Sequence, residues 1–490
     1  MLLIHLDTSS RTPFYLQIFE RVREKIDRGY LKPGERLPSS RELGEQLGVN
    51  RTTTYRAYEE LWAQGYLESR PGSYSFVRKP NPLAGESIIP RKENIHWEER
   101  ITKNTTRLFS RMEDPPDGQE KGLIDFRPLS PDPSLIPHDE YRKCLNQALR
   151  EEKHNLLGYG DPMGYGPLRT FLAKRMKHHG IQAKEDEILI TQGIQNALEL
   201  IMKLMIQPES TILVEEPTYS AALPLFNYYT QFITGVSMDT HGVVLSELET
   251  TIKKHRPAFF YTMPNFHNPC GTTTSQEHRE KLLSLAQKYE MPLLEDGFEE
   301  EMKYFGKAIL PVKSMDREGW VIYLGTFSKV LFPGLRTGWV VADKALIKKL
   351  ASLKKATNIS GNPLDQAALE IFCRSGFYDR HIRRVHRIYR KRMHAAMKAC
   401  RTHLNTNLCT YTKPMGGYTF WVETQAESKR EQELLRLLLD NGVAVSPGNT
   451  FFSGKASRAS FRISIAHRKE EEIEEGIQCI ARALEQISRS

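Results

Sequence analysis

The chain has 490 residues, 39% of them hydrophobic, and contains no window of about 20 apolar residues, which excludes a membrane span and leaves room for two to four folded domains. Its six cysteines are scattered without a CxxC or Cys/His spacing, so we expect no metal site and a reducing, cytoplasmic environment. The net charge of +9 is compatible with nucleic-acid binding, but residues 1–80 carry 13 Lys and Arg against 10 Asp and Glu, so a case for DNA must rest on motif geometry.

The N-terminal segment predicts three short helices. Phe14, Ile18, Val22 and Ile26 recur every four residues and would form one helix face. Ser39 and Glu42 then have the spacing of a capping box, which predicts a helix that ends at Gly48. A third helix would begin near residue 50 and run to 61. Helix, glycine turn and helix is the helix-turn-helix pattern, whose second helix enters the major groove of DNA.

A two-stranded wing is predicted after the third helix, from residues 65–68 and 74–77 joined through a Pro-Gly pair. Residues 12–78 as a whole resemble the GntR-type winged-helix family. The similar motifs are Pro33-Gly34, Leu37-Pro38-Ser39-x-Arg41-x-Leu43, Val49-Asn50-Arg51-Thr52-Thr53 and Gly65-Tyr66-Leu67. The alternative is a small helical unit that serves packing alone.

The resemblance implies that this segment binds double-stranded DNA. Arginine side chains suit guanine or phosphate contacts, and threonine hydroxyls suit phosphate. Tyr55 stands where some relatives carry a further arginine, so a base preference does not carry over. The residues expected at the DNA are Arg41, Asn50, Arg51, Thr52 and Thr53, with Gly72 in the wing.

The remaining chain divides into a predicted linker and a large domain. Residues 80–122 are rich in charge, Asn and Pro and show no regular apolar period, which indicates a linker, with short helical pieces around 94–111. From residue 123 onward, short apolar runs alternate with amphipathic helical stretches, which is typical of strands buried on both faces of a mainly parallel sheet. We therefore expect domains at 1–79 and 123–490. The expected strands lie at residues 187–191, 211–215, 258–262, 292–296, 320–324 and 338–342.

A lysine with cofactor chemistry is predicted at the end of one of these strands. Lys329 follows the strand at 320–324, at the cleft edge of an α/β sheet, and Arg336 lies seven residues further on. A lysine near an arginine in an apolar pocket has a lowered pKa, the condition for Schiff-base chemistry. Asp296 also ends an apolar strand, where a carboxylate is costly unless a partner such as a pyridinium N–H pairs with it.

The ordered set of motifs resembles a class I/II aminotransferase of fold type I over about 123–488. The motifs are Tyr159-Gly160-Asp161-Pro162-x-Gly164, Thr191-x-Gly193-x-Gln195, Glu216-Pro217-x-Tyr219, Asn268-Pro269-x-Gly271, Asp296, Ser328-Lys329, Arg336-x-Gly338 and Arg462. The fold class implied is a small α/β winged helix-turn-helix followed by a large α/β domain that binds pyridoxal 5'-phosphate.

The resemblance also implies a role for each motif residue. Lys329 would form the aldimine with the cofactor, Asp296 would pair with its pyridine nitrogen, and Asn268 would contact its phenolate oxygen. Tyr219 would stack on the ring, and Arg462 would bind the carboxylate of an amino-acid ligand. The phosphate would be held by Gly193, Gln195, Thr326, Ser328 and Arg336, and by Tyr159 from the partner subunit.

One position departs from the family pattern. Phe298 stands two residues after Asp296, where such proteins usually carry a tyrosine whose hydroxyl would bind the cofactor phenolate. A phenyl ring cannot make that hydrogen bond. Cofactor binding is still expected because Asn268 is present, but transaminase activity is expected to be partial or absent.

A GntR-type winged helix fused to an aminotransferase domain is the organisation of the MocR family of bacterial regulators. The resemblance implies a cytoplasmic homodimer that controls transcription through pyridoxal phosphate and an amino compound that reacts at Lys329. Two alternatives stay open: a working aminotransferase, and a sensor of pyridoxal phosphate alone. A basic cluster at residues 383–392 could also contact DNA, but its i, i+4 spacing favours a solvated helix face.

Overall fold

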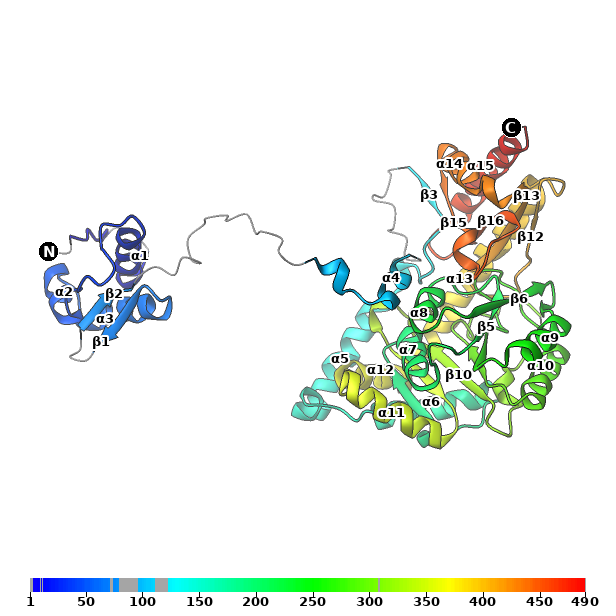
Figure 1. Cartoon of the computed structure of the whole chain (residues 1–490), viewed down its shortest axis with the longest axis horizontal. Coiled ribbons are helices and arrows are strands. Elements are labelled where there is room, and N and C mark those ends of the chain that lie inside the picture. The colour runs from blue at the N-terminus through cyan, green and yellow to red at the C-terminus, as the bar shows by residue number, and fades with distance from the viewer. Residues whose placement is uncertain are drawn as a thin grey trace. The chain divides into compact units, whose positions relative to one another are not determined.

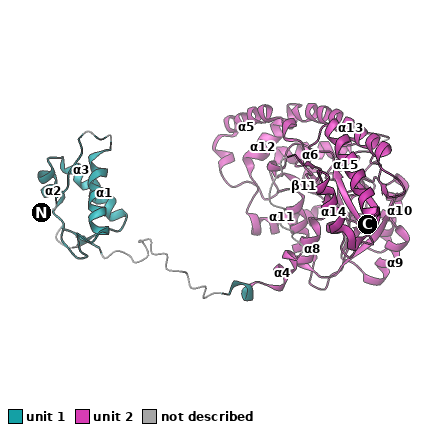
Figure 2. Ribbon diagram, turned by 90° about the horizontal axis from the view of Figure 1, so that it is seen from above, with its two compact units in different colours: residues 1–100 teal, residues 101–490 magenta. Residues whose placement is uncertain are grey.

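The computed structural model describes residues 3–8, 10, 12–70, 74–78, 96–110, 122–306 and 309–489. The chain forms two compact units, Met1–Arg100 and Ile101–Ser490 (Figure 2). Among the helices that the structure describes, none combines the length and apolar character that crossing a bilayer requires.

The first unit is a three-helix domain with a wing. Helix α1 (Phe14–Asp27) packs on α3 (Arg51–Ala63), and α2 (Ser40–Leu47) packs on α3 as well. Strands β1 (Leu67–Arg70) and β2 (Tyr74–Val77) pair antiparallel as the predicted wing, and β1 begins two residues later than predicted (Figure 1). The core of the unit contains Ile18, Val22 and Ile26 of the predicted helix face, whereas Phe14 is 37% exposed.

The helix-turn-helix forms where the sequence predicts it. The capping box is present: Glu42 N–H donates to Ser39 Oγ at 3.2 Å, and Ser39 N–H donates to Glu42 Oε2 at 2.7 Å. Helix α2 ends at Gly48, whose φ of 63° is a conformation that favours glycine. Thr54 Oγ1 donates to the carbonyl of Ser40, and this bond fixes α3 against α2.

The second unit is built around an eight-stranded sheet in the order β4-β11-β10-β9-β8-β5-β6-β7. Strand β11 pairs antiparallel with both neighbours and β7 pairs antiparallel at the edge, while β10, β9, β8, β5 and β6 pair parallel, which confirms the mainly parallel sheet. The strands are β4 (Ile188–Thr191), β5 (Ile212–Glu216), β6 (Ile233–Asp239), β7 (Gly242–Val243), β8 (Phe259–Thr262), β9 (Leu293–Asp296), β10 (Val321–Thr326) and β11 (Gly338–Val341).

Helices cover both faces of this sheet, which explains why its strands are apolar throughout. Helices α7, α8 and α11 pack on one face, whose core includes Val214, Tyr261 and Leu294. Alternate residues such as Leu213 and Phe260 face the opposite layer. The helices of the unit are α4 (Lys103–Phe109), α5 (His138–Glu152), α6 (Gly166–His178), α7 (Ile194–Met205), α8 (Ala222–Tyr229), α9 (Leu245–His255), α10 (Gln276–Lys288), α11 (Lys344–Asn358), α12 (Pro363–Arg374), α13 (Phe377–His403), α14 (Glu431–Asp440) and α15 (Glu470–Arg489).

A second, antiparallel sheet has the order β12-β13-β16-β15 and carries α14 and α15. It consists of β12 (Cys409–Tyr411), β13 (Thr419–Glu427), β15 (Ser446–Pro447) and β16 (Arg458–Ser464). A short parallel pair, β3 (Ile124–Asp125) with β14 (Val443–Ala444), ties the start of the large domain to this part. Arg462 lies in β16, and its side chain contacts Asn268, which follows β8 of the main sheet.

Helix α4 falls within the range that we predicted as linker. It packs against α8 of the large domain, and Arg107 Nη2 lies 3.5 Å from the carbonyl of Tyr228 (Figure 1). The structure thus places α4, which lies within the predicted linker, on the second unit.

Candidate functional site

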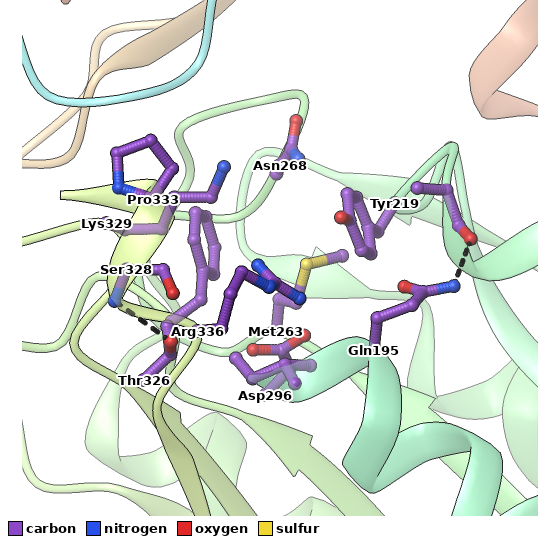
Figure 3. Close-up of a pocket in the computed structure, with 13 residues that line it drawn as sticks. Gln195, Tyr219, Met263, Asn268, Asp296, Thr326, Ser328, Lys329, Pro333 and Arg336 are labelled. Carbon is purple, nitrogen blue, oxygen red and sulfur yellow. Dashed lines mark hydrogen bonds between the residues drawn. The ribbon is translucent and has the colours of Figure 1, made fainter. Parts of the chain in front are cut away.

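A cavity of about 240 Å³ lies at the carboxyl ends of the parallel strands of the second unit. Ligands of open α/β sheets bind at this edge, because the loops that follow neighbouring strands converge there. The side chains labelled in Figure 3 surround one common space. The lining residues are Ile194, Gln195, Tyr219, Ala221, Met263, Asn268, Asp296, Phe298, Thr326, Ser328, Lys329, Pro333 and Arg336.

Lys329 is positioned by the turn that follows β10. Its Nζ donates a hydrogen bond to the carbonyl of Leu129 at 2.5 Å. Burial lowers the pKa of Lys329, and the positive charges of Arg462 and Arg336 lower it further, whereas Glu299 opposes the shift. A larger fraction of the Lys329 side chain is therefore the neutral amine than for a free lysine at the same pH. The neutral amine is the form that attacks a carbonyl carbon.

Asp296 closes the floor of the cavity at the end of β9, and it is 2% exposed. Its Oδ2 accepts a hydrogen bond from the Tyr261 hydroxyl at 2.6 Å. Its Oδ1 has no partner within the described residues, and burial raises the pKa of Asp296 to about 7. An unpartnered carboxylate oxygen buried in a ligand cavity offers a site for a cationic N–H donor.

Polar groups for an anion also lie around the cavity. Gly193 precedes α7 with a φ of 81°, and a Cβ there would lie 3.0 Å from Arg336 Nη2, so glycine allows this guanidinium to approach. Ser328 N–H donates to Thr326 Oγ1 at 3.0 Å (Figure 3). The buried Ser328 Oγ has no partner in the described part of the chain. The amino end of a helix, an arginine and this unpartnered hydroxyl together suit a phosphate group.

Arg462 approaches the site from β16. It donates to Asn268 Oδ1 at 3.0 Å, to the carbonyl of Arg127 at 2.8 Å and to Ser446 Oγ at 2.9 Å. Burial lowers the pKa of Arg462 to about 10, and its Nε has no partner among the described residues. The structure therefore brings together Arg462 and Asn268, which are separated by 194 residues in the sequence.

Two aromatic side chains lie on the cavity wall, whereas the predicted Tyr159 lies elsewhere. Tyr219 lines the cavity, and burial raises its pKa to about 12. Phe298 lines it as well and is 5% exposed. Tyr159 is 85% exposed and does not line the cavity of its own chain.

Sequence reasoning missed three features of this site. Tyr261 is the hydrogen-bond donor to Asp296. The sequence signal for this role was a tyrosine hydroxyl within an otherwise apolar strand. Glu299 is 1% exposed, accepts from Tyr418 N–H at 3.1 Å, and burial raises its pKa to about 8. His267, the residue before Asn268, lies 3.2 Å from Glu215, and both side chains are buried.

The residues predicted to bind DNA lie around the start of α3 in the first unit. Arg51 and Thr52 are exposed and Thr53 is half-buried, while Asn50 Oδ1 caps the helix by accepting from Thr52 N–H at 3.1 Å. Arg41 is exposed on α2, with its Nε 3.2 Å from Glu45 Oε1. The prediction for Gly72 lies outside the described residues.

The residues around the cavity fit pyridoxal phosphate. They supply an amine of lowered pKa, a buried unpartnered carboxylate oxygen, and an anion cradle made of the start of α7, the Arg336 guanidinium and the unpartnered Ser328 hydroxyl. These groups match the carbonyl, pyridine nitrogen and phosphate of the cofactor in chemical type.

Two family matches divide the chain. Residues 14–77 match "Bacterial regulatory proteins, gntR family", and residues 133–480 match "Aminotransferase class I and II".

Individual relatives match either the whole chain or its larger part. The uncharacterized HTH-type transcriptional regulator YisV of Bacillus subtilis is 30% identical over 98% of both chains. Aromatic-amino-acid aminotransferase 1 of Thermococcus litoralis is 34% identical over 73% of this chain and 86% of its own length. The crystal structure of LysN, an alpha-aminoadipate aminotransferase from Thermus thermophilus complexed with N-(5'-phosphopyridoxyl)-L-leucine, superposes with a TM-score of 0.72 at 31% identity and covers 81% of this chain and all of that one.

Proposed function

Because the chain belongs to the class I and II aminotransferase family and joins that domain to a GntR-type DNA-binding domain in the MocR architecture, we propose that it is a transcription regulator controlled by a small molecule. Its first unit binds double-stranded DNA, and its second binds pyridoxal phosphate and an amino compound at Lys329. The working form is a cytoplasmic homodimer. The observation that carries this proposal is the cavity that joins Lys329 and Asp296 in a chain that also has a helix-turn-helix.

The cofactor half of the proposal assigns a holding group to each part of pyridoxal phosphate. Asp296 holds the pyridine nitrogen, Asn268 the phenolate oxygen and Tyr219 the ring face. When bound, pyridoxal phosphate supplies a carbonyl carbon that amines attack and a ring that withdraws electrons. The phosphate is held by Gly193, Gln195, Thr326, Ser328 and Arg336, with Tyr159 of the partner subunit completing the set.

The residues of the chain itself explain how an amino acid would be recognised. Burial lowers the pKa of Lys329, so its amine is available to attach and to be displaced by a competing amine. Arg462 holds the ligand carboxylate, because its guanidinium is buried and already oriented by three oxygen acceptors. Phe298 cannot donate a hydrogen bond to the phenolate, which favours binding over rapid turnover.

Helix α8 offers a short route from the cavity towards the linker. Tyr219 and Ala221 line the cavity immediately before α8 begins, and the Ala221 carbonyl accepts from Gln195 Nε2 at 3.0 Å. The other end of α8 carries Tyr228, against which Arg107 of α4 packs. A ligand that displaces Tyr219 or Gln195 would therefore act on the helix to which the end of the predicted linker is attached.

The proposal is tested by DNA binding of the full-length protein with and without pyridoxal phosphate and a panel of amino acids. We expect a specific fragment, selected from genomic DNA, to bind with an affinity that changes when one amino compound is added. Arg51→Ala should lower that affinity by about 1–3 kcal/mol without altering cofactor binding. Absence of specific DNA binding in the wild-type protein would refute the proposal.

Weakening the α4–α8 contact should uncouple the two halves. Arg107→Ala removes the side chain that reaches the Tyr228 carbonyl. We therefore expect the ratio of DNA affinities with and without ligand to approach one. Coupled sites typically change each other's affinity by roughly 5- to 150-fold. The measurement is DNA affinity with and without ligand, alongside cofactor affinity.

Lys103→Ala is the matched control for this experiment, because Lys103 is an exposed cation on the same helix. An unchanged ligand response in Arg107→Ala would exclude the α4–α8 route and leave DNA binding and cofactor binding as independent findings.

A working aminotransferase is the second candidate, favoured by relatives 34% and 33% identical that are named as an aromatic-amino-acid aminotransferase and a 2-aminoadipate transaminase. Steady turnover of an amino donor with a 2-oxo acid would support it.

A third candidate is a sensor of pyridoxal phosphate alone. It would be supported by a DNA affinity that changes with the cofactor and that no amino compound changes further.

A further inference from the structure

Helix α13 concentrates the positive charge of the protein. Its 27 residues include nine Lys and Arg and one Asp, a net charge of +8, against +9 for the whole chain. Residues 1–80, which contain the winged helix, carry a net charge of +3. A denser run of positive charge than that of residues 1–80 therefore lies in the large domain.

The exposed basic side chains of α13 form one stripe. At 100° per residue, all eight fall within an arc of about 120° on the helix surface, and from first to last they span about 32 Å at 1.5 Å per residue. Arg392 lies on the opposite, buried side, where it pairs with Asp132 at 2.7 Å. We call the exposed set the α13 stripe: Arg380, Arg383, Arg384, Arg387, Arg390, Lys391, Lys398 and Arg401.

The α13 stripe has no acidic counterpart within the described residues. Asp379, the acidic residue of the helix, pairs instead with Arg175 at 2.9 Å. None of the eight side chains has a carboxylate within 4 Å in the part of the chain that the structure describes. Elsewhere on the helix, the buried Arg392 pairs with Asp132, and His403 lies 3.8 Å from Glu474. Two stripe residues lie over aromatic rings: Arg380 over Phe377 and Arg390 over Phe305.

Such an arrangement is unfavourable in isolation. Like charges three and four residues apart repel one another along a helix. The helix is held by its opposite face, where Val385, Tyr389 and Met393 are fully buried, so packing does not require the cations. Most surface helices intersperse both signs, and a face of one sign marks a partner of the other sign.

We propose that the α13 stripe is a second DNA-binding surface, which contacts the phosphate backbone of duplex DNA. This inference rests on the proposed function, in which the winged helix of the same chain supplies sequence recognition. Arginine binds phosphate oxygens in a bidentate manner, and a row of arginines along a straight helix can follow the backbone. Backbone contacts add affinity and position the duplex without reading sequence. The i, i+4 spacing alone favoured a solvated helix face. That interpretation changes because the eight cations lie within one arc of the helix and have no carboxylate partners among the described residues.

The test compares two triple variants of the full-length protein loaded with pyridoxal phosphate. The stripe variant is Arg383→Gln, Arg384→Gln and Arg387→Gln. The matched control removes the same charge from exposed lysines on three other helices, with Lys174→Gln on α6, Lys254→Gln on α9 and Lys349→Gln on α11. The probe is a duplex of unrelated sequence, and the measurement is affinity as a function of salt concentration.

We expect the stripe variant to lose most of its affinity at low salt, and the slope of log affinity against log salt to fall by about 0.9 for each phosphate contact removed, or by up to about 3 in all. The control should keep both affinity and slope close to wild type. Equal losses in both variants would mean that net charge alone matters, and no loss in either would mean a solvated face; both results overturn the proposal.

Failure of the proposed function gives a different pattern. Arg51→Ala, tested on the specific fragment, reports on the winged helix, whereas the stripe variant reports on binding to unrelated duplex. If the stripe variant loses affinity for duplex while no fragment is bound specifically by wild type, the stripe proposal stands and the regulator proposal fails. The unfolding midpoint of each variant confirms that the loss does not come from misfolding.

Discussion

Full-length protein carrying Lys329→Ala is expected to retain no pyridoxal phosphate covalently. Lys329 is the lysine that lines the cavity in the described structure, and its lowered pKa favours the neutral amine that attacks a carbonyl. Alanine removes the nitrogen, so borohydride reduction can no longer fix the cofactor to the chain. The measurement is mass spectrometry of reduced, digested protein, in which wild type should carry the cofactor on the peptide that contains Lys329.

The control for this variant is Lys348→Ala, which removes an exposed lysine of α11 and should leave the modified peptide unchanged. The DNA affinity of Lys329→Ala should also stop responding to amino compounds, because the attachment point that they displace is gone. A cofactor adduct that persists in the variant, or that maps to another peptide in wild type, would disprove the assignment of Lys329.

Asp296→Asn is expected to weaken pyridoxal phosphate binding by about 2–5 kcal/mol, the range for truncating one partner of a buried charge pair. At about 1.4 kcal/mol per tenfold, this corresponds to a roughly 30- to 4,000-fold loss of affinity. The amide cannot neutralise a protonated ring nitrogen, although its oxygen can still accept the hydrogen bond from Tyr261. The measurement is titration of ligand-free protein with pyridoxal phosphate.

A neighbouring carboxylate provides the matched control for Asp296. Glu295 is equally buried, and its pKa is raised to about 7, but it accepts from the N–H groups of Val312 and Lys313 and does not line the cavity. Glu295→Gln should therefore leave cofactor affinity unchanged. Equal affinities of Asp296→Asn and wild type would exclude Asp296 as the partner of the ring nitrogen.

The stability of the ligand-free protein separates this effect from misfolding. The pKa of Asp296 is raised by burial from 3.8 to about 7, so between pH of about 4 and 7 the folded state holds a proton that the unfolded state releases. The contribution of Asp296 to the free energy of unfolding therefore decreases as pH rises through this window. Asp296→Asn lacks this dependence, and above pH 7 the variant should be at least as stable as wild type.

Local signals predicted much of the fold. The capping box at Ser39 and Glu42 and the glycine stop at Gly48 depend on residues next to each other in the chain, so they could be identified without tertiary information. All six expected strands of the large sheet are confirmed within one or two residues, because burial on both faces makes each an uninterrupted apolar run. Strands β12, β13, β15 and β16 were not predicted, since they are partly polar and lack that signal.

The site shows a similar division. Lys329 and Asp296 stand out in the sequence because a charged residue at the end of an apolar strand is unusual. The hydrogen bond from Tyr261 to Asp296 and the contact of Glu215 with His267 join residues on neighbouring strands and loops. No sequence pattern specifies which side chains of neighbouring strands face the same side at the same depth, because register depends on packing of the complete sheet.

The sequence by itself determined the two-part architecture, the helix-turn-helix and the residue types of the cofactor site, because capping, glycine turns and apolar runs act over a few residues. Only the tertiary structure decided that Arg462 meets Asn268, that α4 packs on α8, and that the α13 stripe lacks carboxylate partners in the described chain. Each of these depends on groups that are distant in sequence, and their distances are set by the burial of apolar surface between whole helices and sheets.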